Sequence, residues 1–263
     1  MEKSKVMSLL KRVATSVVLI PAVVCCVLSG YPLILLLAWL GAILMAWEWA
    51  DMVKNTKASV YVLIYFFTVA WCLVFDFSLL TFIIIFGAML FVFLKSKNEE
   101  HRWLLTMGVP YIGIGLGSVL AIYNSAGPLV VLWFMFVVWA VDIGGFCFGC
   151  TLKGPKLAPK ISPNKTWSGF CGGMVLAVAI SSAFCWYLGA EPLLVYAGAL
   201  SAGIAVIAQV GDLIESAVKR HLNIKDSSNL IPGHGGIFDR VDGLIFAAPF
   251  AYLALFLLNI FVE

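Results

Sequence analysis

The sequence predicts an all-α polytopic membrane protein with about nine transmembrane helices. Hydrophobic residues make up 62% of the chain and charged residues only 12%, whereas soluble domains contain about 45–50% apolar and about 25% charged residues. Apolar runs of about 17–22 residues recur along the chain, and a bilayer core of about 30 Å needs about 20 such residues in a helix. The runs are continuous rather than alternating, which favours helices over barrel strands.

The predicted spans follow one another with short polar or glycine- and proline-containing breaks. The basic segment before the first run resembles a signal peptide, but no A-x-A cleavage site follows it, so we interpret this run as a retained first span. Short uncharged or acidic breaks alternate with longer charged segments along the chain. The predicted spans cover residues 13–29, 32–50, 59–75, 77–94, 103–123, 128–148, 169–188, 192–215 and 243–262.

Every lysine and arginine lies in one alternating set of connections. All 17 fall in the N-terminal tail or in segments 51–58, 95–102, 149–168 and 216–242. Cytoplasmic loops retain positive charge, so these segments are expected in the cytoplasm, with the N-terminus inside and the C-terminus outside. We expect one integral-membrane domain over residues 1–263, whose two long loops form the active site.

Four acids lie within or at the ends of predicted spans on the cytoplasmic side. Glu48 stands between two tryptophans, and we interpret it as part of an interfacial aromatic belt. Asp142 lies in WAVDIGG, where the glycines allow close approach of backbone or ligand. Asp212 and Glu215 are three residues apart and therefore share a helix face. An ionisable group in a span is costly and usually faces a cavity or a partner.

The two long cytoplasmic loops carry groups that bind phosphate. SPNKTW gathers hydroxyl, amide and ammonium groups, which bind phosphate oxygens. The Gly-His-Gly-Gly run can wrap an anion with backbone N–H groups, and the carboxylates and cations around it suit phosphates with a hard metal such as Mg²⁺. A topogenic basic loop and solvated ion pairs are the alternative interpretations. The candidate substrate-binding residues are Ser162, Asn164, Lys165, Thr166, Asp142, Asp226, His234, Gly235, Gly236, Arg240 and Asp242.

The segment SAVKRHLNIKDSSNLIPGHGGIFDRVD, residues 216–242, resembles the signature of the CDP-diacylglycerol synthase (phosphatidate cytidylyltransferase) family. Its Ser, Lys-Arg, Lys-Asp, His-Gly-Gly and Asp-Arg-x-Asp elements stand at the family spacing. QVGDLIES, SPNKTW and WAVDIGGFCFG resemble further family motifs, and the resemblance covers roughly residues 100–262. Two positions depart from the pattern: Ser168 replaces the usual Glu, and Gly145-Phe146 replaces a small-aromatic pair.

This resemblance implies that CTP and phosphatidate give CDP-diacylglycerol and pyrophosphate, by in-line attack of the lipid phosphate on the α-phosphorus of CTP. It maps the metal ligands onto Asp212 and Asp239, with Mg²⁺ expected and a second, monovalent cation compatible. We expect a bacterial inner (plasma) membrane enzyme whose active site faces the cytoplasm, with no nucleic-acid partner; a homodimer is compatible with the family likeness. The implied catalytic residues are Asp212, Asp239, Lys219, Arg220 and Lys225.

Two other functions stay open from the sequence. A CTP-dependent polyprenol or phytol kinase would direct an alcohol at the γ-phosphorus and release CDP. An ion-coupled transporter could use intramembrane acids as an ion path, but it predicts acids near the bilayer midplane and internal repeats. Here the acids cluster at the cytoplasmic ends of the spans.

Overall fold

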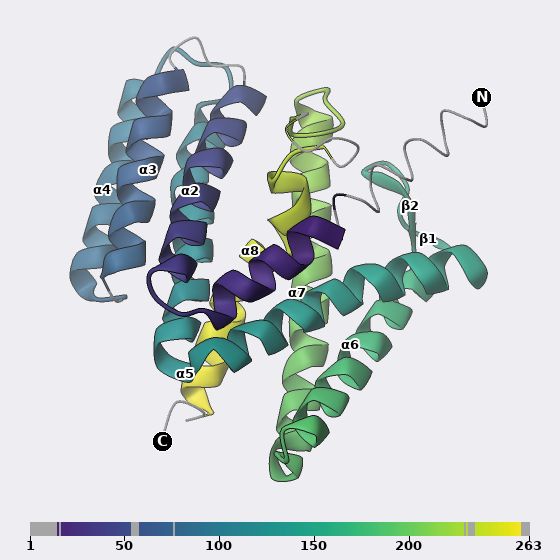
Figure 1. Cartoon of the computed structure of the whole chain (residues 1–263). Helices are drawn as coiled ribbons and strands as arrows, with labels where there is room; N and C mark the ends of the chain where they lie inside the picture. Colours follow the sequence, from purple (N-terminus) through teal and green to yellow (C-terminus); the bar gives the residue numbers. More distant parts are fainter. Residues whose placement is uncertain are drawn as a thin grey trace. The chain divides into compact units, whose positions relative to one another are not determined.

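The computed structural model describes residue 15 and residues 17–53, 58–75, 77–228, 230 and 235–258. Helices joined by short turns make up nearly all of it, with one small hairpin (Figure 1). A helix over Val17–Leu28 comes first. The elements that follow are α2 (Leu33–Met52), α3 (Ala58–Val74), α4 (Leu79–Lys95), α5 (Arg102–Thr151), β1 (Lys156–Ala158), β2 (Ser162–Thr166), α6 (Trp167–Tyr187), the 3₁₀ turn η1 (Glu191–Leu193), α7 (Leu194–His221) and α8 (Phe238–Leu257).

The chain divides into two compact units. The first comprises Met1–Ala121 and Leu222–Val241, and the second comprises Ile122–His221 and Asp242–Glu263. The long helix α5 and the helix α8 each begin in the first unit and continue in the second. Within α5 the helical geometry is broken at Gly127, whose φ is 82°. The break lies where the sequence predicts a turn between two spans.

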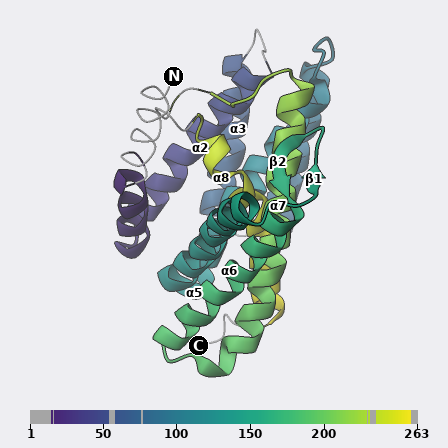
Figure 2. The ribbon, with the colours of Figure 1, turned by 90° about the vertical axis from the view of Figure 1, so that its right-hand side faces the viewer.

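In the first unit, α2, α3 and α4 lie side by side (Figures 1 and 2). Glycines on α5 let neighbouring side chains approach its backbone. A Cβ at Gly113 would lie 3.5 Å from Cys72 Sγ, and one at Gly117 would lie 3.1 Å from Cys72 Cβ. Small residues permit such close packing between helices in membranes. These two glycines therefore serve contacts within one chain.

In the second unit, the C-terminal half of α5 packs closely against α6. A Cβ at Gly144 would lie 2.8 Å from Gly172 O, and one at Gly173 would lie 2.7 Å from Val141 O. Helix α6 in turn lies beside α7 (Figure 2). The indole N–H of Trp133 donates to Ser181 Oγ at 2.8 Å, so the apolar contact also satisfies a buried polar pair.

The prediction of a helical membrane protein is confirmed. Among the described residues, five helices are long and apolar enough to cross a membrane, namely α2, α5, α6, α7 with η1, and α8; three shorter apolar helices span Val17–Leu28, Val60–Val74 and Leu79–Lys95. Large apolar side chains such as Leu79 and Phe86 are 78% and 68% exposed. Apolar helices with exposed apolar faces suit a lipid surround, because no water-facing polar side is needed. The number of crossings stays a prediction.

Three local predictions are wrong. The segment SPNKT is not a loop but strand β2, paired antiparallel with β1. Helix α7 continues to His221 instead of ending at 215, and α8 begins at Phe238 instead of 243. Helix α8 extends into polar sequence because Glu48 accepts the N–H groups at its start, and the end of α7 is tied to the hairpin by Arg220, which donates to Ile161 O. A hydropathy pattern carries no information on such contacts.

Candidate functional site

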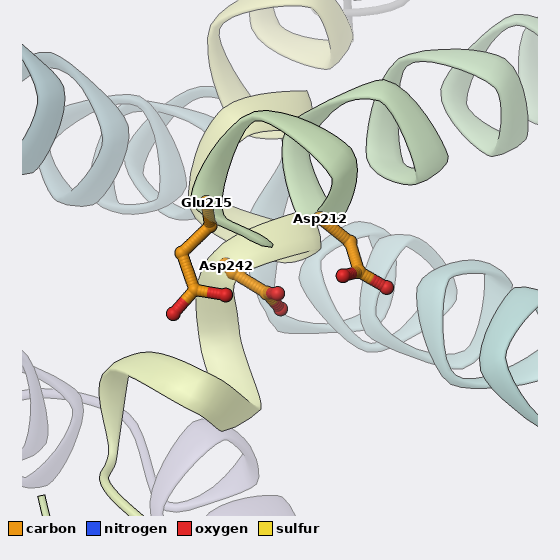
Figure 3. Close-up of side chains that lie close together, drawn as sticks. All are labelled: Asp212, Glu215 and Asp242. Atoms are coloured by element: carbon orange, nitrogen blue, oxygen red, sulfur yellow. The ribbon is translucent and has the colours of Figure 1, made fainter. Parts of the chain in front are cut away.

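Three carboxylates meet where α7 and α8 approach each other. Asp212 and Glu215 come from α7 and Asp242 comes from α8 (Figure 3). Each offers one oxygen, and these three oxygens all lie within 4.8 Å of one another. Glu215 is only 3% exposed. We call these three residues the acid cluster. The spacing of Asp212 and Glu215 predicts a shared helix face, and the structure confirms it.

Glycines on both helices bring the acid cluster together. A Cβ at Gly211 would lie 2.8 Å from Cγ of Phe246, and a Cβ at Gly243 would lie 3.2 Å from Ala208 O. Each glycine is the immediate neighbour of an acid in the cluster. The missing side chains therefore let α7 and α8 approach each other at the positions that carry Asp212 and Asp242.

Two lysines neutralise part of the cluster. Lys165 Nζ pairs with Asp212 Oδ2, and Lys219 Nζ lies 2.8 Å from Glu215 Oε2. The third carboxylate, Asp242, accepts the N–H of its neighbour Gly243 at 2.8 Å. Three carboxyl groups thus outnumber the two ammonium groups that pair with this set. Such a site favours an added cation, and carboxylate oxygens are the ligands that Mg²⁺ prefers.

Asp142 adds further negative charge. This residue lies in the C-terminal half of α5, and its carboxylate repels that of Asp242. Like charges in a poorly solvated place raise each other's energy, so a cation that binds between them is stabilised. The structure thus places Asp142 in the same electrostatic neighbourhood as the acid cluster, as its position at a span end suggests.

The hairpin β1–β2 delivers Lys165 to this cluster. Strand β2 ends at Thr166, whose hydroxyl oxygen accepts the N–H of Gly169 at 3.1 Å and caps the N-terminus of α6. Such a cap contributes about 1 kcal/mol. Ser168, at the position of the usual family Glu, donates to Lys153 O and contacts the Thr166 hydroxyl. The two hydroxyls therefore fix the base of the hairpin, one residue from the lysine that reaches Asp212.

In the first unit, Asp239 holds a turn. Its Oδ2 accepts three hydrogen bonds, from Ser227 N at 2.9 Å, Ser227 Oγ at 3.0 Å and Gly236 N at 2.8 Å. The oxygen thus links Ser227, which precedes the Gly-His-Gly-Gly run, to Gly236, the last residue of that run. The resemblance implies a metal ligand here; the acid cluster that the structure assembles from described residues contains Asp212 but not Asp239.

Glu48 of α2 binds the same region. Oε1 accepts Ser228 Oγ at 2.6 Å and Ile237 N at 2.9 Å, while Oε2 accepts Ser227 Oγ at 3.1 Å and Phe238 N at 2.8 Å. The side chain is 0% exposed. The name loop clasp is used below for Glu48, Asp239 and the groups that donate hydrogen bonds to them. A hydrogen bond to a charged group contributes about 1.5–3 kcal/mol, so the clasp is a substantial part of local stability.

The interpretation of Glu48 as an interfacial anchor is therefore wrong. In a helix, Glu48 shares a face with Met45 and Met52, both of which are buried, whereas Trp47 is 43% exposed and faces outward. The tryptophan neighbours belong to other faces. Because α2 is apolar all round, its sequence alone does not show which face is buried.

Two glycines at the loop clasp, Gly235 and Gly236, have no room for a side chain. Gly235 has a φ of 85°, which side-chain-bearing residues rarely adopt, and a Cβ there would lie 2.7 Å from Asp239 Oδ2. A Cβ at Gly236 would lie 2.6 Å from Glu48 Oε2. Both positions thus need glycine because a carboxylate occupies the space of the side chain. Their predicted role in substrate binding stays a prediction.

The remaining predicted residues are distributed over both units. Arg220, at the end of α7, donates from Nε to Ile161 O on the hairpin at 3.4 Å. Ser162 is half-buried on β2, and His234 lies outside the described residues. Exposed side chains are those of Asn164, Lys225, Asp226 and Arg240.

Nearly the whole chain matches a known family. The model of the Cytidylyltransferase family matches residues 10–258. The curated phosphatidate cytidylyltransferase of Bacillus subtilis is 40% identical over 156 residues, 58% of each chain. That of Brucella suis is 40% identical over 164 residues, which are 62% of this chain and 60% of the relative. That of Rickettsia bellii is 34% identical over 250 residues, which are 92% of this chain and 88% of the relative.

The fold and the site define the class of protein first: a helical membrane protein with an acid cluster that suits a cation. The chain belongs to the cytidylyltransferase family. The alignments span about three fifths of the Bacillus and Brucella relatives, and nearly nine tenths of the Rickettsia relative. The resemblance seen in the signature segment is therefore confirmed over most of the chain.

Proposed function

We propose that this protein is a phosphatidate cytidylyltransferase, which converts CTP and phosphatidate to CDP-diacylglycerol and pyrophosphate in phospholipid biosynthesis. Family membership over residues 10–258 supports this proposal. The acid cluster with its two lysines carries it, since this is the arrangement that phosphoryl chemistry requires. Such chemistry depends on positioning and charge neutralisation rather than on a covalent enzyme intermediate.

The reaction is a single in-line displacement. A phosphate oxygen of phosphatidate forms a bond to the α-phosphorus of CTP, while the bond from that phosphorus to the oxygen bridging it to the β-phosphorus breaks. The electron pair leaves with pyrophosphate. The residues Lys165, Lys219, Arg220 and Lys225 are proposed to bind the phosphate and pyrophosphate oxygens.

The residues of the acid cluster fit a magnesium ion. Asp212, Glu215 and Asp242 offer three carboxylate oxygens within 4.8 Å of one another, and these three acids outnumber the two lysines that pair with them. We propose that they hold Mg²⁺, with Asp239 as the further ligand that the resemblance implies; a monovalent second ion would suit the same acids. When bound, Mg²⁺ supplies positive charge to phosphate oxygens and so stabilises the charge of the transition state.

The paired lysines have a second role in this proposal. Without a cation, Lys165 and Lys219 compensate the carboxylates of Asp212 and Glu215. With a divalent cation held by these acids, the ammonium groups of Lys165 and Lys219 would be available to phosphate oxygens. The two lysines would then keep a charged partner with or without the cation, which avoids an uncompensated buried charge.

We also propose an inner-membrane location, with nine crossings, the N-terminus and the site in the cytoplasm and the C-terminus outside. The segregation of all 17 lysines and arginines supports this orientation. Alkaline phosphatase fused after the last helix should be active in cells, since that enzyme matures only outside the cytoplasm. Fusion within 149–168 should give an inactive reporter. The opposite pattern would reverse the orientation. A homodimer stays a prediction from the family likeness.

The purified protein with phosphatidate, Mg²⁺ and CTP labelled at the α-phosphorus tests the reaction. The label should move into CDP-diacylglycerol, and pyrophosphate should appear in equal amount. A polyprenol or phytol kinase would leave the label in free CDP and need a lipid alcohol. A transporter would give neither product. Absence of labelled lipid from folded protein would overturn the proposal.

A further inference from the structure

The loop clasp connects a carboxylate of α2 with residues nearly 180 positions later in the chain. Ser227, Ser228, Ile237 and Phe238 all donate to Glu48, at sequence separations of 179–190 residues. Among the described residues, the recorded ion pairs are Lys165–Asp212 and Lys219–Glu215, so Glu48 is compensated by hydrogen bonds rather than by a cation. A buried carboxylate needs such a full set of donors to remain charged.

Two of these donors define the beginning of α8. The helix begins at Phe238, and the N–H groups of Ile237 and Phe238 both point to Glu48. The first N–H groups of a helix lack partners inside the helix, and negative charge is favourable there. Glu48 therefore caps α8 from another helix. The ring of Phe238 also packs on Trp49 and Tyr111, at centroid distances of 5.2 Å and 5.4 Å.

The beginning of α8 determines where its acids lie. Asp239 is in the first turn, and Asp242 follows three residues later on the same helix. A shift of one residue at the helix start would rotate both side chains by about 100°, because an α-helix has 3.6 residues per turn. Gly236, just before the helix, has no room for a side chain beside Glu48, so the entry path of the chain is fixed as well.

We infer that Glu48 is a positioning residue for this enzyme, which fixes the start of α8 and thereby places Asp239 in the first turn of that helix. The inference rests on the proposed cytidylyltransferase function. Glu48 touches no reacting atom in this scheme and acts through the helix that it caps. It extends the functional set to α2, outside the segment that resembles the family signature.

The Glu48→Gln variant tests this inference. A carboxamide keeps the size of the side chain but has one acceptor oxygen, so its NH₂ must face the N–H of either Ile237 or Phe238. Hydrogen exchange of the purified protein should show the amides of 235–240 exchanging about tenfold faster, as loss of one such bond predicts. Tyr65→Phe is the matched control, because it removes a buried bond to Leu105 O in the same unit and should leave these amides unchanged.

The activity measurement uses the same two proteins. Glu48→Gln should lower kcat by about 10- to 100-fold and raise the Mg²⁺ concentration for half-maximal rate, as outer-shell changes do. Tyr65→Phe should leave both values unchanged. If Glu48→Gln does not fold, Ser228→Ala removes one donor and should give a smaller change in the same direction.

The outcomes distinguish a failure of the positioning role of Glu48 from a failure of the proposed function. Unchanged local exchange, or unchanged kcat and Mg²⁺ requirement, would overturn the positioning role. Faster exchange throughout the chain would overturn it too, because Glu48 would then serve general stability. If the wild type makes no CDP-diacylglycerol but the amides of 235–240 respond locally, the cap on α8 is supported and the proposed function is wrong.

Discussion

Carboxylates have opposite surroundings in the two units. In the loop clasp, six donor groups surround Glu48 and Asp239, and the single hydroxyl proton of Ser227 is shared between Glu48 Oε2 and Asp239 Oδ2. In the acid cluster, three carboxylates lie close together, and Lys165 and Lys219 pair with two of them. The loop clasp therefore contains more hydrogen-bond donors than carboxylates, whereas the acid cluster contains more carboxylates than lysines.

This difference shows how acids in one protein take different roles. A carboxylate such as Glu48, with both oxygens satisfied by N–H and O–H donors, is a structural element, since a cation would have to displace those donors. A group of carboxylates that repel one another binds a cation readily, since the cation removes the repulsion. Burial does not distinguish the two roles, because Glu48 and Glu215 are both buried. The groups that each acid contacts distinguish them.

The largest effect should follow from a change in the acid cluster. Asp212→Asn removes one negative charge and one metal ligand but keeps the shape of the side chain. Turnover should fall at least about 100-fold, because electrostatic stabilisation of the transition state is lost. Thermal unfolding in detergent should be unchanged. Near-normal turnover would show that Asp212 is not part of the active site, and the functional difference between the acid cluster and the loop clasp would be lost.

Asp239→Asn should affect both turnover and stability. The amide group can accept through only one of its two ends, so part of the bonding to Ser227 and Gly236 is lost. We expect a large loss of turnover together with a destabilisation of about 1–3 kcal/mol. Comparison of its unfolding temperature with that of Asp212→Asn measures how much of the effect of Asp239→Asn is a loss of stability. A variant as stable as wild type would indicate a ligand role without a clasp role.

Replacement of a lysine tests the positive charges that pair with the acid cluster. Lys165→Met removes the cation paired with Asp212 and leaves an apolar stem of similar length. The affinity for CTP should fall by about 10- to 100-fold, the value of one charge-assisted hydrogen bond. Lys160→Met, an exposed lysine on the same hairpin, is the control and should change binding little. Equal effects of the two changes would indicate general attraction by basic residues.

The smallest effect is expected at the base of the hairpin. Thr166→Ala removes the N-cap of α6 and should cost about 1 kcal/mol in the free energy of unfolding. Thr166→Ser retains the capping oxygen and should restore most of this loss. Because Lys165 is the preceding residue, KM for CTP should rise slightly in the alanine variant alone. If both variants behave alike, the hydroxyl does not position the lysine.

Hydropathy and local spacing predicted much of this molecule. Continuous apolar runs predicted the helices because the membrane imposes their length, and the spacing of Asp212 and Glu215 predicted a shared face because the helix imposes its period. The hairpin was missed because its segment is short and polar. Glu48 was missed because its partners lie 179 or more residues away, and no local pattern in α2 signals them. Asp142 and Lys165 were recognised as candidates, but their neighbours were not.

The bonds of Glu48 have a consequence for biosynthesis. A ribosome that adds about 5–20 residues per second needs roughly ten to forty seconds to make the chain between this acid and its last donor. Throughout that interval the second helix carries a carboxylate whose future partners have not yet been translated. The amino-terminal unit therefore cannot reach its final form during its own synthesis, and its completion depends on the arrival of the last helix. A chain truncated before Ser227 should retain an unsatisfied acid and be a ready substrate for membrane proteases.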